Sequence, residues 1–344
     1  MKMDIINPAD WPQWDDLVLA TNGYSFFHSA SWAKVLSSSY HYKPTYFTLE
    51  EKGKLRALIP IMEVRSLLTG RRGVSLTFSD YCEPLVANRE DFPILLAHVI
   101  EYARKSGWGY IEFRGGRSFL PHAPVFAGYL GHTTPLSGND HDLLSRLRDS
   151  TRRNIRKAGL AGVETRICTD MQSVGEFYHL HCMTRKRHGV PPQPFSFFRN
   201  IHTYVISKNL GFVILASHNG RIIAGAVFFH FGDKALYKYG ASDESYQHLR
   251  ANNLVIWEAL KYYSLNGFAS FCFGRTDHDD EGLRQFKNGW DTTEKDICYF
   301  RYDIEKERFL GNDTGKLTKY ARHAGKIPFP MLKAIGQKLY RHMG

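Results

Sequence analysis

An internal repeat constrains the fold of this chain more than any other feature, because the same order of elements occurs twice. The first copy has apolar runs at 45–49 and 58–64, joined by the turn Lys52-Gly53-Lys54. The second copy has apolar runs at 211–215 and 225–231, joined by Asn219-Gly220-Arg221. Each pattern predicts a β-hairpin, since a short glycine-containing turn connects two apolar runs.

Each hairpin is followed by an amphipathic helix, a glycine and a short buried strand. The first helix is expected over 92–105 with Gly107 after it, and the second over 254–265 with Gly267 after it. Glycine at this place is typical of a left-handed helix end. The repeat therefore predicts an α/β (α+β) fold of two tandem lobes, each a mixed, mostly antiparallel sheet flanked by helices.

The length of 344 residues suits about two domains, and a turn-rich stretch near 135–143 marks their boundary. We expect a first lobe over 1–138, a second lobe over 139–310 that carries the active site, and a basic tail over 311–344.

The net charge of +11 is concentrated in two places, 146–157 and the tail 311–344, and the rest of the chain is nearly neutral. This distribution argues against a protein that coats nucleic acid along a broad face, and no specific DNA binding is expected. The N-terminus lacks an apolar signal region, no apolar run is long enough to span a bilayer, and the five cysteines are scattered without a CxxC. These features predict a soluble cytoplasmic protein with reduced thiols, which the basic tail could bring to the periphery of the inner membrane.

Several segments of the second half, and two of the first, match a known pattern in their order and spacing. They are Arg152–Ala158, Thr184–Pro192, Tyr237–Ser242, Asn253–Ala259, Phe273–Arg275 and Gly282–Trp290, with Phe27–Trp32 and Phe78–Tyr81 upstream. Over roughly 20–303 the chain resembles the Fem family of peptidoglycan-bridge aminoacyltransferases, which are tandem GNAT-fold proteins. Within that family it is most similar to the Fem-like proteins encoded beside exopolysaccharide genes in Gram-negative bacteria.

The resemblance implies two GNAT-like lobes and an N-acyltransferase that moves an acyl or aminoacyl group to an amine of a cell-envelope or exopolysaccharide precursor. The donor stays open between acyl-CoA and aminoacyl-tRNA. GNAT enzymes hold the coenzyme A pyrophosphate with small residues at a helix N-terminus, whereas the stretch 247–252 has Arg250 and Asn252 at those places. The long helical arm of many enzymes that use aminoacyl-tRNA does not fit the glycines and prolines of 158–210.

Acyl transfer requires a base for the amine, donors for the oxyanion and alignment of the two substrates. Lys287 is expected to contact the oxyanion or a donor phosphate, although a solvated helix lysine is the alternative. Tyr239 is expected to transfer a proton, with packing on a strand face as the alternative. Asp243 and Asp80 are the carboxylates that could act as general base, and each could instead occupy an ordinary surface turn.

A cluster of four cations, Arg152, Arg153, Arg156 and Lys157, suits the diphosphate of a lipid- or nucleotide-linked acceptor, because guanidinium groups bind phosphate in a bidentate manner. A solvated basic helix is the alternative. Four further residues complete the expected substrate-binding set: Arg185, His188, Arg275 and Phe286.

No metal is expected, because the contiguous acids of Asp277–Glu281 lack the spacing that directs several ligands to one ion. The tail places Met331, Leu332, Ile335, Leu339 and Met343 on one helix face. That stripe could contact the membrane near a lipid-linked acceptor, or could pack onto the protein itself.

Two functions of other classes remain as alternatives. One is a non-catalytic GNAT-fold binder of polysaccharide or lipid-linked precursors. The other is a protein that binds tRNA or another nucleic acid through its two basic segments, which lack interleaved aromatic residues.

Overall fold

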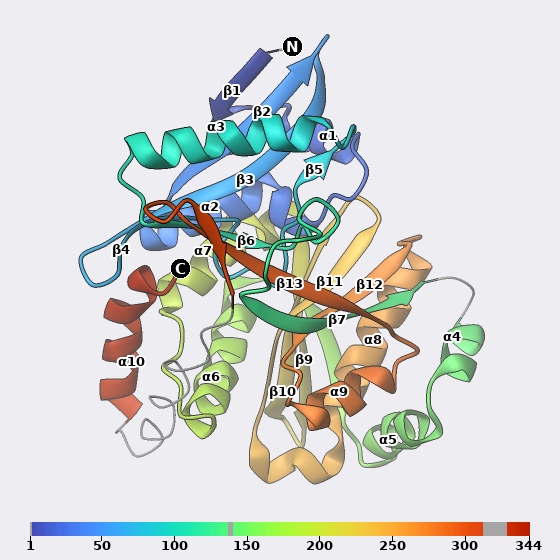
Figure 1. Cartoon of the computed structure of the whole chain (residues 1–344). Coiled ribbons are helices and arrows are strands. Elements are labelled where there is room, and N and C mark those ends of the chain that lie inside the picture. Colours follow the sequence, from blue (N-terminus) through green and yellow to red (C-terminus); the bar gives the residue numbers. More distant parts are fainter. Residues whose placement is uncertain (1, 137–139, 312–328) are drawn as a thin grey trace. The chain divides into compact units, whose positions relative to one another are not determined.

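The computed structural model describes residues 2–136, 140–311 and 329–344 (Figure 1). The chain divides into two compact units. Of the described residues, unit 1 comprises 2–129, 296–311 and 338–344, and unit 2 comprises 130–136, 140–295 and 329–337.

Unit 1 contains the sheet strands and helices of the first repeat copy. Its elements are β1 (Lys2–Ile6), α1 (Trp14–Leu19), α2 (Ala30–Tyr40), β2 (Lys43–Glu51), β3 (Lys54–Ser66), β4 (Gly70–Val74), β5 (Leu85–Val86), α3 (Asp91–Lys105), β6 (Tyr110–Arg114), most of β13 (Thr293–Asp303), β14 (Arg308–Leu310) and the short 3₁₀ helix η6 (Tyr340–His342).

Unit 2 contains the second copy with additional helices. Its elements are most of β7 (Ala127–Pro135), α4 (Asp140–Arg146), α5 (Asp149–Leu160), β8 (Glu164–Cys168), α6 (Met171–Arg187), α7 (Phe195–Tyr204), β9 (Gly211–His218), β10 (Arg221–Phe231), β11 (Lys234–Ser242), the 3₁₀ helix η4 (Glu244–Leu249), α8 (Ala251–Leu265), β12 (Ser270–Thr276), α9 (Glu281–Asn288) and nearly all of α10 (Phe329–Leu339).

The predicted two-lobed α/β fold is confirmed by the strand pairing inside each unit. Unit 1 has the order β2-β3-β4-β6-β13, and unit 2 has the order β9-β10-β11-β12-β7. The single parallel step of each order lies at the same place, with Arg72 opposite Tyr110 in unit 1 and Lys234 opposite Ser270 in unit 2. All other neighbours in these two orders for which pairing is given are antiparallel.

Local chemistry explains why both hairpins form. Each closes with a two-residue turn in which both residues have positive φ, Lys52 and Gly53 in the first and Asn219 and Gly220 in the second. Such turns match the twist of the flanking strands. The predicted glycines after the long helices also adopt the left-handed conformation, since φ is 67° at Gly107 and 75° at Gly267.

The boundaries of the units differ from those expected at 138/139 and 310/311. Each sheet is completed by a strand from the other half of the chain, because β13 pairs with β6 in unit 1 and β7 pairs with β12 in unit 2. Hydrophobic patterning identifies such strands but not the strands with which they pair. The turn-rich stretch near 135–143 follows β7, so a boundary placed there assigns β7 to the first lobe.

Each sheet buries its apolar face against its long helix. In unit 1, Leu95 and Val99 of α3 pack on Phe47, Ile59 and other strand residues. In unit 2, α8 is buried on several sides of the helix, and Val255, Ala259 and Leu260 share a core with strand residues from β9, β10 and β12. This burial is the main stabilising contribution, at roughly 25 cal/mol per Å² of apolar surface.

The tail is helical where the structure describes it. Leu332 of α10 is fully buried, and Gly336 lies so close to Pro192 that a side chain would collide with it. Met331, at 58% exposure, and Ile335, at 37%, remain exposed. Of the five residues of the predicted apolar stripe, Leu332 is thus buried, Leu339 is partly buried and the other three are exposed. Residues 312–328 of the tail lie outside the described part. Among the helices of the described residues, none combines the length and the hydropathy required to cross a bilayer.

Candidate functional site

The central strands of unit 2 separate at the place where the second repeat copy carries its matched motifs. Strands β11 and β12 pair over only three positions, from Lys234 opposite Ser270 to Leu236 opposite Cys272. Beyond them β11 continues to Ser242 and leads through η4 into α8. The diverging strands and the start of α8 thus border one region.

A cavity of about 240 Å³ lies at the N-terminus of α8. Its lining includes Asp243, Gln247, Arg250, Asn252, Asn253 and Phe286. A helix N-terminus presents unpaired backbone N–H groups and a partial positive charge, which favour an anionic ligand. The cavity therefore combines a polar, anion-attracting end with the aromatic ring of Phe286.

Arg250 connects η4 to α8 in the left-handed conformation, with φ of 61°. Its position and that of Asn252 are the ones at which coenzyme A-binding GNAT loops have small residues. Here the side chains of both residues line the cavity instead. A ligand at this helix end would meet these side chains as well as the backbone.

Asp243 holds the wall of this cavity in place. Its carboxylate accepts hydrogen bonds from the Ser245 N–H at 3.1 Å and from Arg221 Nη2 at 2.9 Å, and the residue is 5% exposed. The first bond caps η4 and the second is an ion pair. Both carboxylate oxygens of Asp243 are therefore engaged, and its role as general base stays a prediction.

Lys287 is a buried cation in the last turn of α9, with 2% of its surface exposed. Its Nζ donates to the carbonyl oxygens of Arg275 at 2.8 Å and Gly274 at 3.3 Å. The register of β12 against β7 shifts between Cys272 and Arg275, and an irregular strand leaves main-chain groups without a ladder partner. Lys287 is therefore not the solvated helix lysine of the alternative interpretation.

A chain of hydrogen bonds beside Lys287 determines the tautomer of His132. Asn288 Nδ2 donates to the Glu294 carboxylate at 2.8 Å, so Asn288 Oδ1 faces His132 Nδ1 at 3.2 Å as an acceptor. His132 then carries its proton on Nδ1, and its buried Nε2 has no hydrogen-bond partner within the described ranges. Burial, followed by the charge of Lys287, lowers the pKa of His132, which keeps the imidazole neutral.

Tyr239 lies on β11 within an aromatic group. Its ring packs against His181, Phe197 and Phe198 at centroid distances of 6.0, 6.2 and 5.5 Å. Lys238 Nζ lies 5.4 Å from the ring centre. These contacts supply the packing role expected as the alternative, and proton transfer by Tyr239 stays a prediction.

Three of the four cluster cations border a second cavity of unit 2, of about 600 Å³. Arg152, Arg153 and Arg156 of α5 line it together with Trp257 of α8, whereas Lys157 is exposed outside this lining. Arg152 is partly neutralised by Asp149. Arg153 and Arg156 have no ion pair with an acid in the part of the chain that the structure describes, which leaves their charge available to an anion.

Residues of the Thr184–Pro192 motif lie at the end of α6. Arg185 Nε donates to the Pro191 carbonyl at 3.3 Å and is thereby held against its own loop. Burial lowers the pKa of His188, with further contributions from neighbouring arginines, while Asp280 and Glu244 oppose the shift. Acids at the starts of η4 and α9 thus act electrostatically on the His188 imidazole.

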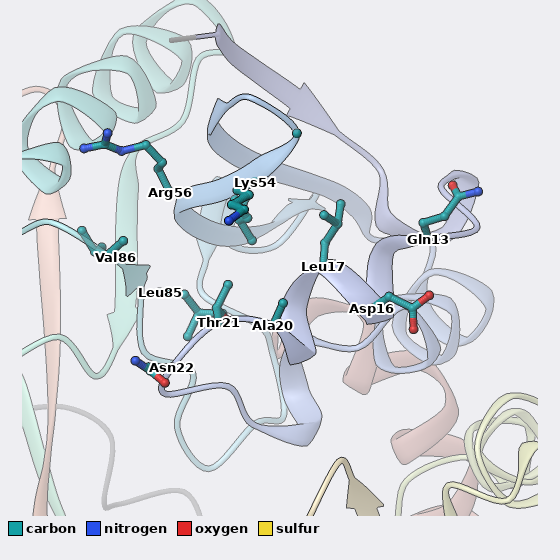
Figure 2. Close-up of a pocket in the computed structure, with 13 residues that line it drawn as sticks. Gln13, Asp16, Leu17, Ala20, Thr21, Asn22, Lys54, Arg56, Leu85 and Val86 are labelled. Carbon is teal, nitrogen blue, oxygen red and sulfur yellow. The ribbon is translucent and has the colours of Figure 1, made fainter.

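The remaining predicted catalytic residue, Asp80, belongs to unit 1, where its main-chain carbonyl accepts from the Tyr299 hydroxyl at 2.7 Å. Unit 1 also has a cavity of about 600 Å³, shown in Figure 2. Leu17 and Leu85 contribute apolar surface to its lining, and Lys54 contributes a cation. None of the predicted site residues lines this cavity, so the sequence motifs do not assign it to acyl transfer.

Residues 145–288 match the family model described as acetyltransferase (GNAT) domain. This range contains the α8 cavity, Lys287 and the arginine cluster. The structure of this chain is similar to the crystal structure of FemX, with a TM-score of 0.69, 15% identity, and coverage of 87% of this chain and 97% of that chain.

The chain thus contains a GNAT acetyltransferase domain and is Fem-like in its fold.

Sequence comparison with curated proteins leads to the same group. The Fem-like chain is 34% identical over 86 residues to lipid II:glycine glycyltransferase of Staphylococcus haemolyticus (strain JCSC1435), covering 23% of this chain and 20% of that protein. It is 33% identical over 110 residues to the protein of the same name from Staphylococcus saprophyticus subsp. saprophyticus (strain ATCC 15305 / DSM 20229 / NCIMB 8711 / NCTC 7292 / S-41), covering 29% and 26%. The matches thus span a fifth to a quarter of these relatives.

The tandem arrangement recurs in a further solved structure. A tandem GNAT protein from the clavulanic acid biosynthesis pathway aligns with a TM-score of 0.56 at 12% identity, covering 88% of the Fem-like chain and 98% of that chain. At this identity the likeness shows the fold alone, and it agrees with the two units described above.

Several residues that line the two candidate cavities were not among the predicted site residues. Gln247 and Asn253 line the α8 cavity, and Trp257 lines the arginine cavity. The N-terminus of a predicted helix was the signal that could have identified the first two. His132 carried no local signal, since only the pairing of β7 with β12 brings it to Asn288.

Proposed function

We propose that this chain transfers an aminoacyl or acyl group to the amine of a cell-envelope precursor, and that the donor binds at the N-terminus of α8. The α8 cavity carries the proposal, because it joins two predicted site residues, Asp243 and Phe286, to an anion-attracting helix end. The relatives support the acceptor class, since they are named for glycine transfer to lipid II. An exopolysaccharide precursor is the second acceptor to be tested.

In the proposed reaction the amine nitrogen attacks the donor carbonyl, a C–N bond forms, and the ester or thioester bond of the donor breaks. The base that takes the amine proton is Asp80 or Asp243, and Tyr239 returns a proton to the leaving group. Lys287 stabilises the oxyanion or a donor phosphate through the charge it holds at the end of β12. Each of these roles is a proposal that follows from the matched motifs and from residue chemistry.

The acceptor phosphate is assigned to Arg153 and Arg156 with Arg152 and Lys157, because an arginine-lined cavity beside Trp257 offers bidentate donors and an aromatic wall. We further propose that Arg185, His188 and Arg275 contact substrate, and that the tail 311–344 contacts the membrane near a lipid-linked acceptor. The exposed Met331 and Ile335 of α10 are available for such a contact.

The test offers aminoacyl-tRNA and acyl-CoA in parallel to the purified protein, with lipid II or an amine-bearing glycolipid as acceptor, and detects product by mass spectrometry. Donor binding is compared between Arg250→Ala and the control Arg199→Ala, which changes an exposed arginine of α7. Loss of a charged hydrogen bond should weaken donor binding about tenfold in Arg250→Ala alone. Equal donor affinity of the two variants would refute the assignment of the α8 cavity, and absence of product with every donor would refute the activity.

A further inference from the structure

The hairpin formed by β3 and β4 in unit 1 ends in two exposed leucines. Leu67 is 95% exposed and Leu68 is 70% exposed, in the turn between Ser66 and Gly70 (Figure 1). Turns of this kind usually carry Gly, Asn, Asp, Pro or Ser. A single exposed apolar residue is ordinary, but two adjacent leucines at the tip of a hairpin require an explanation.

The turn has a defined conformation, so the exposure does not come from a loose loop. Ser66 Oγ accepts hydrogen bonds from the N–H groups of Leu68 at 3.1 Å and Thr69 at 2.9 Å. The same hydroxyl contacts His342 Nδ1 at 2.9 Å, and Thr69 Oγ1 donates to the His342 carbonyl at 3.3 Å. The segment around η6 therefore braces the turn from inside unit 1.

Cations surround the two leucines. Arg65 and Arg71 flank the turn and are exposed, and His342 brings its exposed neighbours Arg341 and Met343 to the same place. Met343 is 50% exposed. Residues 64–75 contain no acid, and the Glu63 carboxylate that pairs with Arg65 is buried. We call Leu67, Leu68, Met343, Arg65, Arg71 and Arg341 the hairpin patch.

We propose that the hairpin patch docks on an anionic lipid surface, with Leu67 and Leu68 inserted at the level of the acyl chains and the arginines on lipid phosphates. Exposed leucines in a hairpin turn that arginines flank match the interfacial region of a bilayer. A protein partner is a poorer match, because a stable protein interface needs about 800 Å² on each side, and a hairpin tip does not offer that area. The docking would bring the protein to the surface where a lipid-linked acceptor resides.

The experiment measures co-sedimentation of the full chain with vesicles, in the absence of any acyl donor or acceptor. Vesicles of phosphatidylcholine mixed with phosphatidylglycerol are compared with vesicles of phosphatidylcholine alone. The double variant Leu67→Ser with Leu68→Ser should reduce binding to the mixed vesicles by at least about tenfold for each leucine. The matched control is Leu160→Ser with Leu265→Ser, which changes leucines of unit 2 that are 84% and 74% exposed, and it should bind like the wild type.

A second variant tests the cations. Arg71→Gln with Arg341→Gln should abolish the preference for anionic vesicles, and added salt should weaken wild-type binding in the same direction. Equal vesicle binding of the leucine variant and the wild type would overturn the proposal, as would failure of the folded wild type to bind mixed vesicles. A change in self-association without vesicle binding would assign the patch to a protein interface, and would also overturn it. Because no acyl transfer is measured, these outcomes are independent of the proposed transfer activity, whereas failure of the wild type to bind vesicles would also overturn the proposed membrane contact of the tail 311–344.

Discussion

Replacing Lys287 by methionine separates its structural contribution from its proposed chemistry. Methionine keeps an unbranched apolar stem of similar length and removes the ammonium group. The wild-type ammonium donates to the Arg275 and Gly274 carbonyls at 2.8 and 3.3 Å, inside a site that leaves 2% of the residue exposed. The variant therefore leaves two carbonyl groups of an irregular strand without this donor.

The magnitude follows from two opposing effects. Hydrogen bonds from a charged donor contribute roughly 1.5–3 kcal/mol each, and a buried acceptor that loses its donor costs roughly 1–3 kcal/mol. Removal of the charge recovers part of its desolvation cost. Since both acceptors stay in place, we expect the Lys287→Met variant to lose about 2–4 kcal/mol of unfolding free energy. If Lys287 also stabilises the oxyanion, turnover of the folded variant should fall by about 10²–10³-fold.

Urea unfolding measures the first effect through the midpoint at constant slope, and product formation in the absence of urea measures the second. The control is Lys295→Met, an exposed lysine of β13, which should change neither quantity by much. An unchanged midpoint in Lys287→Met would refute the described bonding of the ammonium. Wild-type turnover in the folded variant would refute its catalytic role while leaving the structural one intact.

Three further predictions concern other parts of the molecule. Arg72 is 2% exposed, and its guanidinium donates to the main-chain carbonyls of His342 and Gly344. Arg72→Met should therefore lower the unfolding free energy by about 3 kcal/mol, whereas Arg71→Met, which changes an exposed neighbour, should not. Equal urea midpoints of these two variants would contradict this prediction. Burial lowers the pKa of His181 to about 3. Below about pH 6.5 the unfolded chain therefore binds a proton at this residue that the native protein does not bind, and the unfolding free energy should fall as the pH falls from about 6.5 towards 4. His181→Leu should flatten that slope by about 1.4 kcal/mol per pH unit in urea titrations, and an unaltered slope would count against a neutral buried His181. Arg153→Gln with Arg156→Gln should raise the KM for a phosphate-bearing substrate by about tenfold or more without lowering the urea midpoint, and an unchanged KM would remove the phosphate assignment.

The candidate site illustrates the limit of motif reasoning. Asp243 and Phe286 line one cavity and three of the four cluster cations line another, while the roles predicted for them stay predictions. The hydrogen-bond and packing partners of each side chain could not be predicted from the sequence, however, because these partners are distant along the chain. Asp243 is engaged by Arg221, which sits on the preceding strand, and Tyr239 packs on the helix that begins at Phe195.

The sequence by itself determined the elements whose cause is local. Two-residue turns with positive φ at Gly53 and Gly220 fold both hairpins, and Gly107 and Gly267 end both long helices, since only neighbouring backbone groups are involved. The repetition of these signals was sufficient to predict a doubled α/β fold.

Tertiary structure alone decided which strand completes each sheet. A strand can pair with any free sheet edge, and β7 and β13 pair with strands that are not their neighbours in sequence. It also decided that Lys287 is buried while Leu67 is not. Burial is a property of the packed whole, and a helix lysine enters the interior only where an irregular strand from elsewhere offers it carbonyl oxygens.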